Sequence, residues 1–327
     1  MNIEYYEDIV LHDYEPTVDT FEAEVLTGLN APTGLKRIPS KFFYDEEGSR
    51  LFREITVLDE YYLTRTEVAI LRERLPEMAR LIGPEAFIVE FGTGSGLKTK
   101  LLLEALDRPA TYVPIDISRE QLLDASLELV ESFPGLEVWP VCADYTQEFS
   151  LPSSERPAKQ TTVFFPGSTV GNFTPEEAIQ FLQNISRMMG PRGSLLIGVD
   201  LVKDVGILNA AYNDRRGITA QFNLNLLTRM NREFETKIAV EDFEHYAGFN
   251  DSENRIEMHL VSRVPQELLL SGNTIALEGG EHILTEYSYK YTSEAFTDLM
   301  RKGGFEVVEN WRDPLNYFAV YFCSVKS

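Results

Sequence analysis

A glycine-rich turn, VEFGTGSGLKT, is the part of the sequence with the clearest potential for chemistry. An apolar run typical of a β-strand precedes it, and LLLEAL, which is typical of a helix, follows it. Glycines in such a turn let the backbone approach a nucleotide closely, and the helix N-terminus can bind a negatively charged group. A strand-to-helix turn that binds no ligand is the alternative interpretation.

Three types of nucleotide-binding loop compete for these residues. A P-loop needs Gly directly before Lys98 and Thr99, and the dinucleotide motif G-x-G-x-x-G needs Gly at the same position, which Leu97 occupies. A kinase or ATPase would also use Asp200 to hold magnesium. The third pattern, an acid followed by three alternating glycines, is satisfied and resembles the first motif of class I methyltransferases, which use S-adenosylmethionine. Its residues are Glu90, Gly92, Gly94 and Gly96.

Polar residues at the ends of the next two predicted strands are further candidates, because ligands of open α/β sheets bind at the carboxyl ends of the strands. Asp116 lies twenty positions after Gly96, where a carboxylate can accept hydrogen bonds from both ribose hydroxyls. Asp144 and Tyr145 follow the third strand, where methyltransferases commonly place an acid against the adenine amine. Either acid could instead be an ordinary turn residue. With the glycine loop and Lys98, these residues predict an S-adenosylmethionine site.

The elements that must position these residues alternate between β-rich and helical patterns, which predicts βαβ units and a parallel sheet. Capping-box spacing predicts helix starts at Thr64, Ser118 and Thr174. Near the C-terminus a helix precedes two strands close enough to form a hairpin. The expected fold is therefore an α/β, Rossmann-like, seven-stranded and mostly parallel sheet, with the strands FIVEF, TYVPIDI, LEVWPVC, TTVFFPG, GSLLIGVD, FEVVENW and YFAVYFCSV.

The alternation is interrupted between residues 201 and 290, a stretch too long for a loop and with periodic segments of its own. The residues before the sheet have the pattern of helices and turns. We therefore expect a nucleotide-binding domain of residues 67–200 and 291–327, and a composite substrate-binding domain of residues 1–66 and 201–290. The active site is expected in the cleft between the two domains.

The composition limits the classes of partner. The chain of 327 residues has a formal net charge of -22, which repels phosphate backbones, and we expect no nucleic-acid partner. No apolar run approaches a membrane span and the N-terminus is acidic, so we expect no membrane association and a cytoplasmic protein. We also expect a monomer. The two cysteines, Cys142 and Cys323, suit a reducing compartment. The four histidines have no metal-ligand spacing, so no metal is expected.

Seven further segments, in this order, give the chain a second resemblance: KFFYDEEGSRLFREIT, EYYLTRTE, FFPGSTVGNFTP, VDLVKD, AYNDRRGITAQFN, NRIEMHL and ILTEYSYK. They resemble the amino-acid N-alpha-methyltransferases typified by the histidine enzyme of ergothioneine biosynthesis. The resemblance implies a class I methyltransferase fold with an added substrate domain. It also implies three successive methyl transfers from S-adenosylmethionine to the α-amino nitrogen of L-histidine, which give hercynine.

The resemblance also implies the substrate contacts. Asn172 and Tyr212 would hold the carboxylate, with Tyr44 near the amine as the catalytic residue. The imidazole would be bound by Tyr61, Glu286 and Ser288, with Met258 lining the same pocket.

The residues themselves leave simpler alternatives open. Asn172 follows a glycine-flanked turn and could serve the turn alone, and tyrosines often pack in a core. If ILTEYSYK is a strand, Glu286 and Ser288 share one face, while Thr285, Tyr287 and Tyr289 share the other. A polar strand edge facing solvent would give the same pattern.

Two rival functions also remain at this point. A relative that methylates another aromatic amino acid, such as a tryptophan derivative, would keep the fold, although an apolar ring would leave Glu286 unpaired. A non-catalytic S-adenosylmethionine-binding sensor belongs to another class. An assay for methyl acceptance separates both rivals from the histidine enzyme.

Overall fold

The computed structural model describes residues 2–6, 9–14, 18–94, 96–147, 149–152 and 158–326, without the side chains of 18–20. The chain forms two compact units. The first comprises Met1–Pro16, Leu63–Val202 and Lys290–Ser327, and the second comprises Thr17–Tyr62 and Lys203–Tyr289. The N-terminal residues therefore belong to the first unit, and not to the composite domain in which the sequence interpretation placed them.

A ten-stranded mixed sheet forms the core of the first unit, with the strand order β1-β2-β6-β4-β3-β7-β8-β15-β14 and with β5 paired to β4. Neighbouring strands from β6 to β8 are parallel, whereas β15 runs antiparallel to both β8 and β14. The strands are β1 (Asn2–Tyr5), β2 (Val10–Asp13), β3 (Ala86–Phe91), β4 (Thr111–Asp116), β5 (Glu137–Val138), β6 (Val141–Cys142), β7 (Gln160–Phe165), β8 (Gly193–Asp200), β14 (Phe305–Arg312) and β15 (Phe318–Val325).

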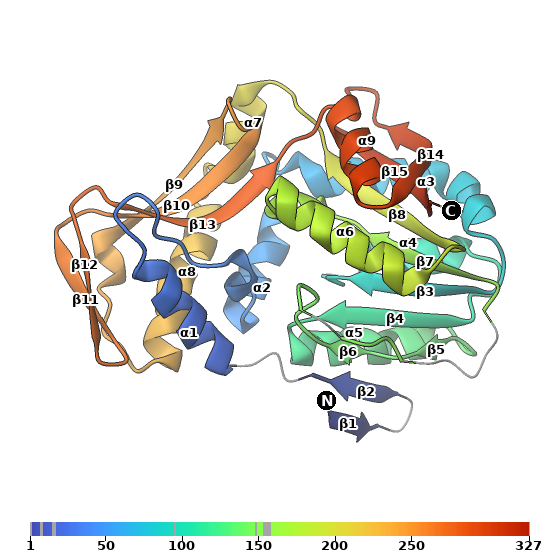
Figure 1. Cartoon of the computed structure of the whole chain (residues 1–327), viewed down its shortest axis with the longest axis horizontal. Coiled ribbons are helices and arrows are strands. Elements are labelled where there is room, and N and C mark those ends of the chain that lie inside the picture. The colour runs from blue at the N-terminus through green and yellow to red at the C-terminus, as the bar shows by residue number, and fades with distance from the viewer. Residues whose placement is uncertain are drawn as a thin grey trace. The chain divides into compact units, whose positions relative to one another are not determined.

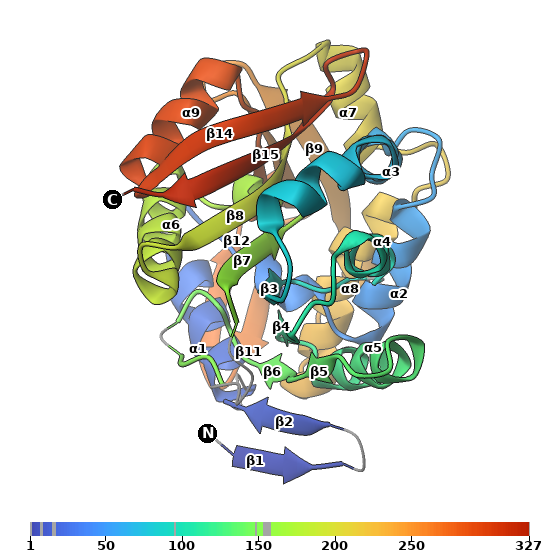
Figure 2. The same cartoon turned by 90° about the vertical axis from the view of Figure 1, so that its right-hand side faces the viewer.

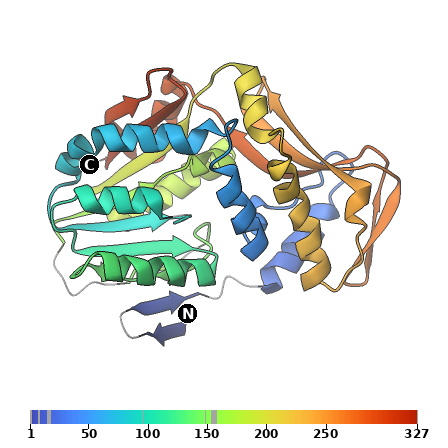
Figure 3. The same cartoon turned by 180° about the vertical axis from the view of Figure 1, so that it is seen from behind.

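Helices cover both faces of this sheet, which is why β3 and β8 are buried along their whole length. Figure 1 shows α6 and α9 on one face, and Figure 3 shows α3, α4 and α5 on the other. Figure 2 shows the two helix layers on either side of the twisted sheet. The helices are α3 (Tyr62–Ile82), α4 (Leu97–Ala105), α5 (Arg119–Ser132), α6 (Pro175–Met189) and α9 (Ser293–Lys302).

The sheet has more strands than the seven predicted, for two reasons. The predicted strand LEVWPVC is split into β5 and β6 by Trp139 and Pro140, because proline has no N–H for strand pairing. The N-terminal residues, expected as helices and turns, form the hairpin of β1 and β2, and β2 pairs in parallel with β6. Leu11 in β2 is fully buried against Leu122 and Cys142.

Two of the three predicted helix starts are confirmed. Thr174 and Glu177 form the reciprocal capping box of α6. Ser118 is the N-cap residue of α5, although its side chain makes no capping hydrogen bond. The third prediction was wrong, because α3 begins at Tyr62, so that Thr64 lies inside the helix and Glu67 is buried.

The second unit contains a three-stranded antiparallel sheet with the order β13-β10-β9, and a separate hairpin of β11 and β12. Figure 3 shows α7 and α8 lying against this sheet. The strands are β9 (Phe243–Asn250), β10 (Arg255–Ser262), β11 (Gln266–Leu270), β12 (Asn273–Leu277) and β13 (His282–Tyr289). The helices are α1 (Val18–Leu29), α2 (Glu46–Ile55), α7 (Val205–Tyr212) and α8 (Ile218–Glu233). Within the described residues, no helix is both long and apolar enough to cross a membrane.

Candidate active site

The glycine loop joins β3 to α4 at the carboxyl edge of the parallel strands. Gly92, Gly94 and Gly96 have φ angles of 72°, 54° and 69°, in the left-handed region that other residues rarely adopt. Gly96 is the N-cap residue of α4, and no side chain caps the helix there. The three glycines therefore adopt the backbone conformations that a tight turn between β3 and α4 needs.

Asp116 ties this loop to the end of β4. Its Oδ2 accepts hydrogen bonds from the backbone N–H of Thr93, at 3.1 Å, and from the Thr93 hydroxyl, at 3.3 Å. Its Oδ1 accepts the N–H of Ser118 at 2.9 Å. Burial raises the pKa of this carboxyl, and the donors from Ser118 and Thr93 oppose that shift. The backbone N–H of Ile117 also donates to this carboxyl and lowers its pKa, so Asp116 is held chiefly by backbone donors.

Glu90 is only 1% exposed and lies beneath the loop. Its Oε2 accepts hydrogen bonds from the hydroxyls of Thr99 and Tyr112, each at 2.7 Å. Burial raises the pKa of Glu90 to about 7, although the two hydroxyl donors lower it. Glu90 therefore joins β3 to α4 and β4 from inside the core, and these contacts support the loop without needing a ligand.

Asp144 and Tyr145 follow β6 at the same edge of the sheet. The Oδ1 atom of Asp144 accepts hydrogen bonds from the N–H and the hydroxyl of Thr146, at 2.9 and 2.6 Å. The half-buried ring of Tyr145 lies edge-on to Phe91, with 5.5 Å between centroids, and 5.8 Å from Phe181. This aromatic cluster is a suitable wall for a flat adenine ring.

Lys98 has an ion-pair partner, Glu67, that we did not predict from the sequence. It forms an ion pair with Glu67 of α3, whose side chain is 1% exposed. The backbone N–H of Gly167 donates to both carboxylate oxygens of Glu67, at 3.0 and 2.9 Å. A Cβ atom at Gly198 would lie 2.0 Å from Glu67 Oε1, so only glycine leaves room for this carboxylate.

Glu67 thus connects the first turn of α4 to the turn after β7. Its helical spacing from Leu71, Leu75 and Met78 places a charge on the apolar face of α3, and that is the signal by which the sequence could have revealed it.

Asn172 ends the short 3₁₀ helix η2 (Thr169–Asn172) in the turn after β7, within the first unit. The turn begins at Ser168, whose hydroxyl oxygen accepts the N–H of Asp200 at 2.9 Å. Asp200 itself is fully buried and pairs with Lys290 at 2.8 Å. A carboxylate enclosed in this way is not placed to hold magnesium, which counts against a kinase or ATPase.

The other residues assigned to the substrate lie in the second unit, where several meet. The hydroxyl of Tyr212, the last residue of α7, donates to Ser288 Oγ at 2.7 Å, and both side chains are buried. The rings of Tyr61 and Tyr212 are 6.5 Å apart in an edge-to-face arrangement. Glu286 lies two residues before Ser288 on β13 and is the strand partner of Met258 on β10.

Tyr44 extends this group through aromatic contacts. Its ring lies edge-on to Phe52 and Phe222, with centroids 5.6 and 5.9 Å away. Phe52 also contacts Tyr61, with 6.4 Å between centroids. A series of rings therefore runs from Tyr44 to Tyr212 and ends at the hydroxyl of Ser288.

The prediction that Thr285 shares a face with Tyr287 and Tyr289 was wrong. Thr285 donates a hydrogen bond to Asn223 of α8, at 2.8 Å, whereas the rings of Tyr287 and Tyr289 lie against Arg255. The physical reason is an irregularity in β13: the consecutive residues Met258 and His259 of β10 pair with Glu286 and Leu284, so the strand pairing passes over Thr285 and the alternation of β13 changes there.

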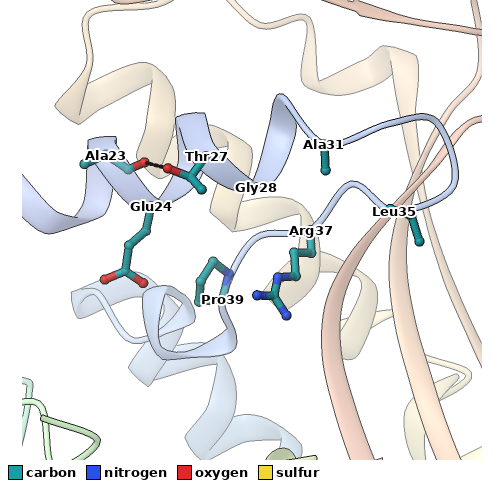
Figure 4. Close-up of a pocket in the computed structure, with 8 residues that line it drawn as sticks. All are labelled: Ala23, Glu24, Thr27, Gly28, Ala31, Leu35, Arg37 and Pro39. Atoms are coloured by element: carbon teal, nitrogen blue, oxygen red, sulfur yellow. Dashed lines mark hydrogen bonds between the residues drawn. The ribbon is translucent and has the colours of Figure 1, made fainter.

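One surface pocket of the second unit is separate from these residues. It has a volume of about 520 Å³ and runs along α1, as Figure 4 shows. Its lining includes Glu24, Leu35 and Arg37, and none of the predicted site residues lines it. Across the described part of the chain, no three histidine, cysteine, aspartate or glutamate side chains form a group that could hold a metal ion.

Comparisons with known proteins identify the family. The model of a family described as histidine-specific, S-adenosylmethionine-dependent methyltransferases matches residues 21–325. A histidine N-alpha-methyltransferase of Mycolicibacterium smegmatis is 36% identical over 312 residues, which cover 94% of this chain and 95% of that protein. Another, from Mycobacterium tuberculosis, is 38% identical over 290 residues, covering 87% of this chain and 89% of that protein. This chain belongs to that family.

A more distant relative, ergothioneine biosynthesis protein 1 of Neurospora crassa, is 32% identical over 89% of this chain, which spans 33% of that protein. The crystal structure of a possible exported protein from Bordetella parapertussis has a TM-score of 0.52 at 10% identity, covering 96% of this chain and 91% of that one, and shows the fold alone. Family membership confirms the predicted enzyme class, the class I methyltransferase-like α/β fold and the cofactor, S-adenosylmethionine.

Proposed function

We propose that this enzyme transfers three methyl groups in succession from S-adenosylmethionine to the α-amino nitrogen of L-histidine, giving hercynine. The observation that carries the proposal is the grouping of Tyr212 and Ser288 with Glu286 and Met258, in a chain that matches the histidine-specific family over most of its length. The two mycobacterial relatives described above are named histidine N-alpha-methyltransferases, which supports histidine as the substrate and its α-amino nitrogen as the acceptor.

The first unit supplies the residues for the cofactor in this proposal. The backbone of Gly92, Gly94 and Gly96 would lie against the amino-acid and ribose parts, and Asp116 would accept the ribose hydroxyls. Asp144 and Tyr145 would hold the adenine, and Lys98 would contribute a positive charge beside the loop. Glu90 acts indirectly, by holding the loop. When bound, S-adenosylmethionine supplies an electrophilic methyl group on its sulfonium.

The second unit supplies most of the residues for the amino acid, and Asn172 of the first unit is the exception. Glu286 and Ser288 would pair with the two imidazole nitrogens, and Tyr61 and Met258 would enclose the ring. Tyr212 and Asn172 would hold the carboxylate. This arrangement favours a substrate with a polar ring, because an apolar ring has no N–H to donate to the Glu286 carboxylate.

Tyr44 would orient the amine and help to remove its proton, since only a neutral amine has the lone pair needed for attack. The product nitrogen is a quaternary cation without N–H donors. Aromatic faces hold such a cation through their quadrupoles, so the rings of Tyr44 and Phe52 suit a nitrogen that gains methyl groups.

Glu286→Ala tests the choice of histidine over another aromatic amino acid. We expect a fall of about ten- to a hundredfold in kcat/KM for histidine, because the imidazole loses a charged partner, and a relative gain for tryptophan. Glu244→Ala, at an exposed carboxylate of β9, is the matched control. An unchanged ratio of the two efficiencies would remove Glu286 from the imidazole site.

We also propose that the enzyme works as a monomer in the cytoplasm on free amino acid and not on nucleic acid. The net charge of -22 and the two buried free thiols, Cys142 and Cys323, support this setting. Sedimentation at several protein concentrations tests the monomer.

A further inference from the structure

A polar network of the second unit lies directly behind Tyr212 and includes His245 of β9. His245 Nε2 lies 2.9 Å from the backbone oxygen of Tyr212, and its Nδ1 lies 2.9 Å from Asn223 Nδ2. Tyr212 is therefore fixed at both ends, by His245 at its carbonyl and by Ser288 at its hydroxyl.

The partners determine the tautomer of His245. A carbonyl oxygen can only accept, so Nε2 must carry the hydrogen that it donates to Tyr212. Asn223 Nδ2 can only donate, so Nδ1 must be the unprotonated acceptor. The same Nδ2 also donates to the backbone oxygen of His259 at 2.9 Å, which uses both of its hydrogens and fixes the amide orientation. Both ring nitrogens of His245 can make these hydrogen bonds only when the imidazole is neutral.

The network continues from Asn223 to the strand that bears Glu286. Thr285 Oγ1 lies 2.8 Å from Asn223 Oδ1 and 3.1 Å from the backbone oxygen of Met258, so these two acceptors share the single hydrogen of its hydroxyl. The Asn223 and Thr285 side chains are 0% and 2% exposed. Because water does not compete for their hydrogen bonds, these bonds hold both side chains firmly in place. Met258 and Glu286, the neighbour of Thr285, are both assigned to the imidazole. The network therefore connects the carboxylate-binding end of the site with the imidazole-binding end.

We propose that His245, as the neutral Nε2–H tautomer held between Tyr212 and Asn223, is a positioning residue that sets the spacing between Tyr212 and Glu286 and so determines the affinity for the amino-acid substrate. This inference rests on the proposed function, because it takes Tyr212 and Glu286 as substrate contacts. It adds a residue that touches neither substrate nor cofactor in that proposal.

The surroundings of His245 favour the neutral form. Burial lowers the pKa of His245, whereas the carbonyl of Tyr212 and the carboxylate of Asp214 raise it. Asp214 is itself engaged with the N–H groups of Ile218 and Thr219, at 3.0 and 2.8 Å. A proton on Nδ1 would face the Asn223 amide N–H₂, and the amide would have to turn over and lose its bond to His259.

Two substitutions change different parts of the network. His245→Gln keeps a donor that can reach the Tyr212 carbonyl and removes the acceptor for Asn223. Asn223→Asp replaces a donor with an acceptor, so that His245 must become protonated to satisfy it. We expect KM for histidine to rise about tenfold in His245→Gln, with kcat and the Kd for S-adenosylmethionine changed less than twofold. In Asn223→Asp we expect the His245 pKa to rise and the pH profile of KM to shift with it.

His282→Gln is the matched control, because His282 is an exposed histidine on β13 outside the network. Nitrogen-15 NMR of the wild type should show His245 as the Nε2–H tautomer at neutral pH, and thermal melting should confirm that each variant is folded. An unchanged KM in folded His245→Gln, or a protonated or Nδ1–H His245 in the wild type, would overturn the inference. Absence of histidine methylation by the wild type would instead overturn the proposed function, while the NMR result would still decide whether the network exists.

Discussion

Asp116 holds the glycine loop through the backbone N–H and the hydroxyl of Thr93, and the proposed function also assigns it to the ribose of the cofactor. We predict that Asp116→Ala weakens S-adenosylmethionine binding by about 1.5 to 3 kcal/mol, the usual value of a hydrogen bond to a charged group. Titration calorimetry measures the change. Asp124→Ala, at an exposed position of α5, is the control. Equal affinities in wild type and Asp116→Ala would remove the cofactor assignment.

Glu90 provides a prediction about pH. Its pKa is raised from 4.5 to about 7 in the folded protein, so the folded state binds a proton more tightly than the unfolded state. Its contribution to stability is therefore complete below about pH 4.5 and is lost as the pH rises through about 7. Glu90→Gln stays neutral and should gain stability relative to wild type between about pH 5 and about pH 8.5. A difference in melting temperature that does not vary with pH would contradict the assigned cause.

Candidate site residues that follow a recognisable strand could be predicted from the sequence. Residues whose role depends on contacts with distant parts of the chain could not. Asp116, Asp144 and the glycines stand at strand ends, where the α/β pattern itself directs attention. The role of Glu67 depends on its contacts with Lys98 and Gly167, which lie far from it in the sequence. The role of His245 depends in the same way on Tyr212 and Asn223. A charge on an apolar helix face was the only sequence signal for Glu67, and its spacing from Thr64 had suggested a helix cap instead.

At the scale of elements, the N-terminal strand β2 was the main feature that the sequence did not reveal. It has four residues, and its pairing partner β6 has two, so neither shows a clear period. The strand is nevertheless part of the core, because Leu11 is fully buried beside Leu122 and Cys142. The longer strands were predictable because buried strands appear in the sequence as apolar runs. Helix α6 was predictable because a capping box marks its start.

Leu11→Ala tests whether β2 is a stable part of the first unit. Removing a fully buried leucine side chain should cost about 2 to 5 kcal/mol of unfolding free energy, measured by denaturant titration. Tyr5→Ala is the control, because Tyr5 on the neighbouring strand is 80% exposed and should change stability by less than about 0.5 kcal/mol. Equal stability of the two variants would mean that the hairpin is not packed on the sheet in solution.

At the scale of the whole molecule, the residues assigned to the cofactor and most of those assigned to the amino acid lie in different units. The sheet of the first unit carries the loop and acids assigned to the cofactor, and the second unit carries most of the side chains assigned to the amino acid. The interruption of the βαβ pattern after β8 made the second unit visible in the sequence, since its own helices and strands are periodic. Its polar network was not visible, because α7, α8 and three strands contribute to it.

The most direct test of the central claim is the mass of the product. The protein is incubated with excess S-adenosylmethionine and, separately, each of the standard amino acids, and the amino acids are then analysed by mass spectrometry. We predict that histidine gains three methyl groups on its α-amino nitrogen, and that no other amino acid is methylated as efficiently. A histidine that remains unmodified or stops at one methyl group, or preferential methylation of another amino acid, would contradict it.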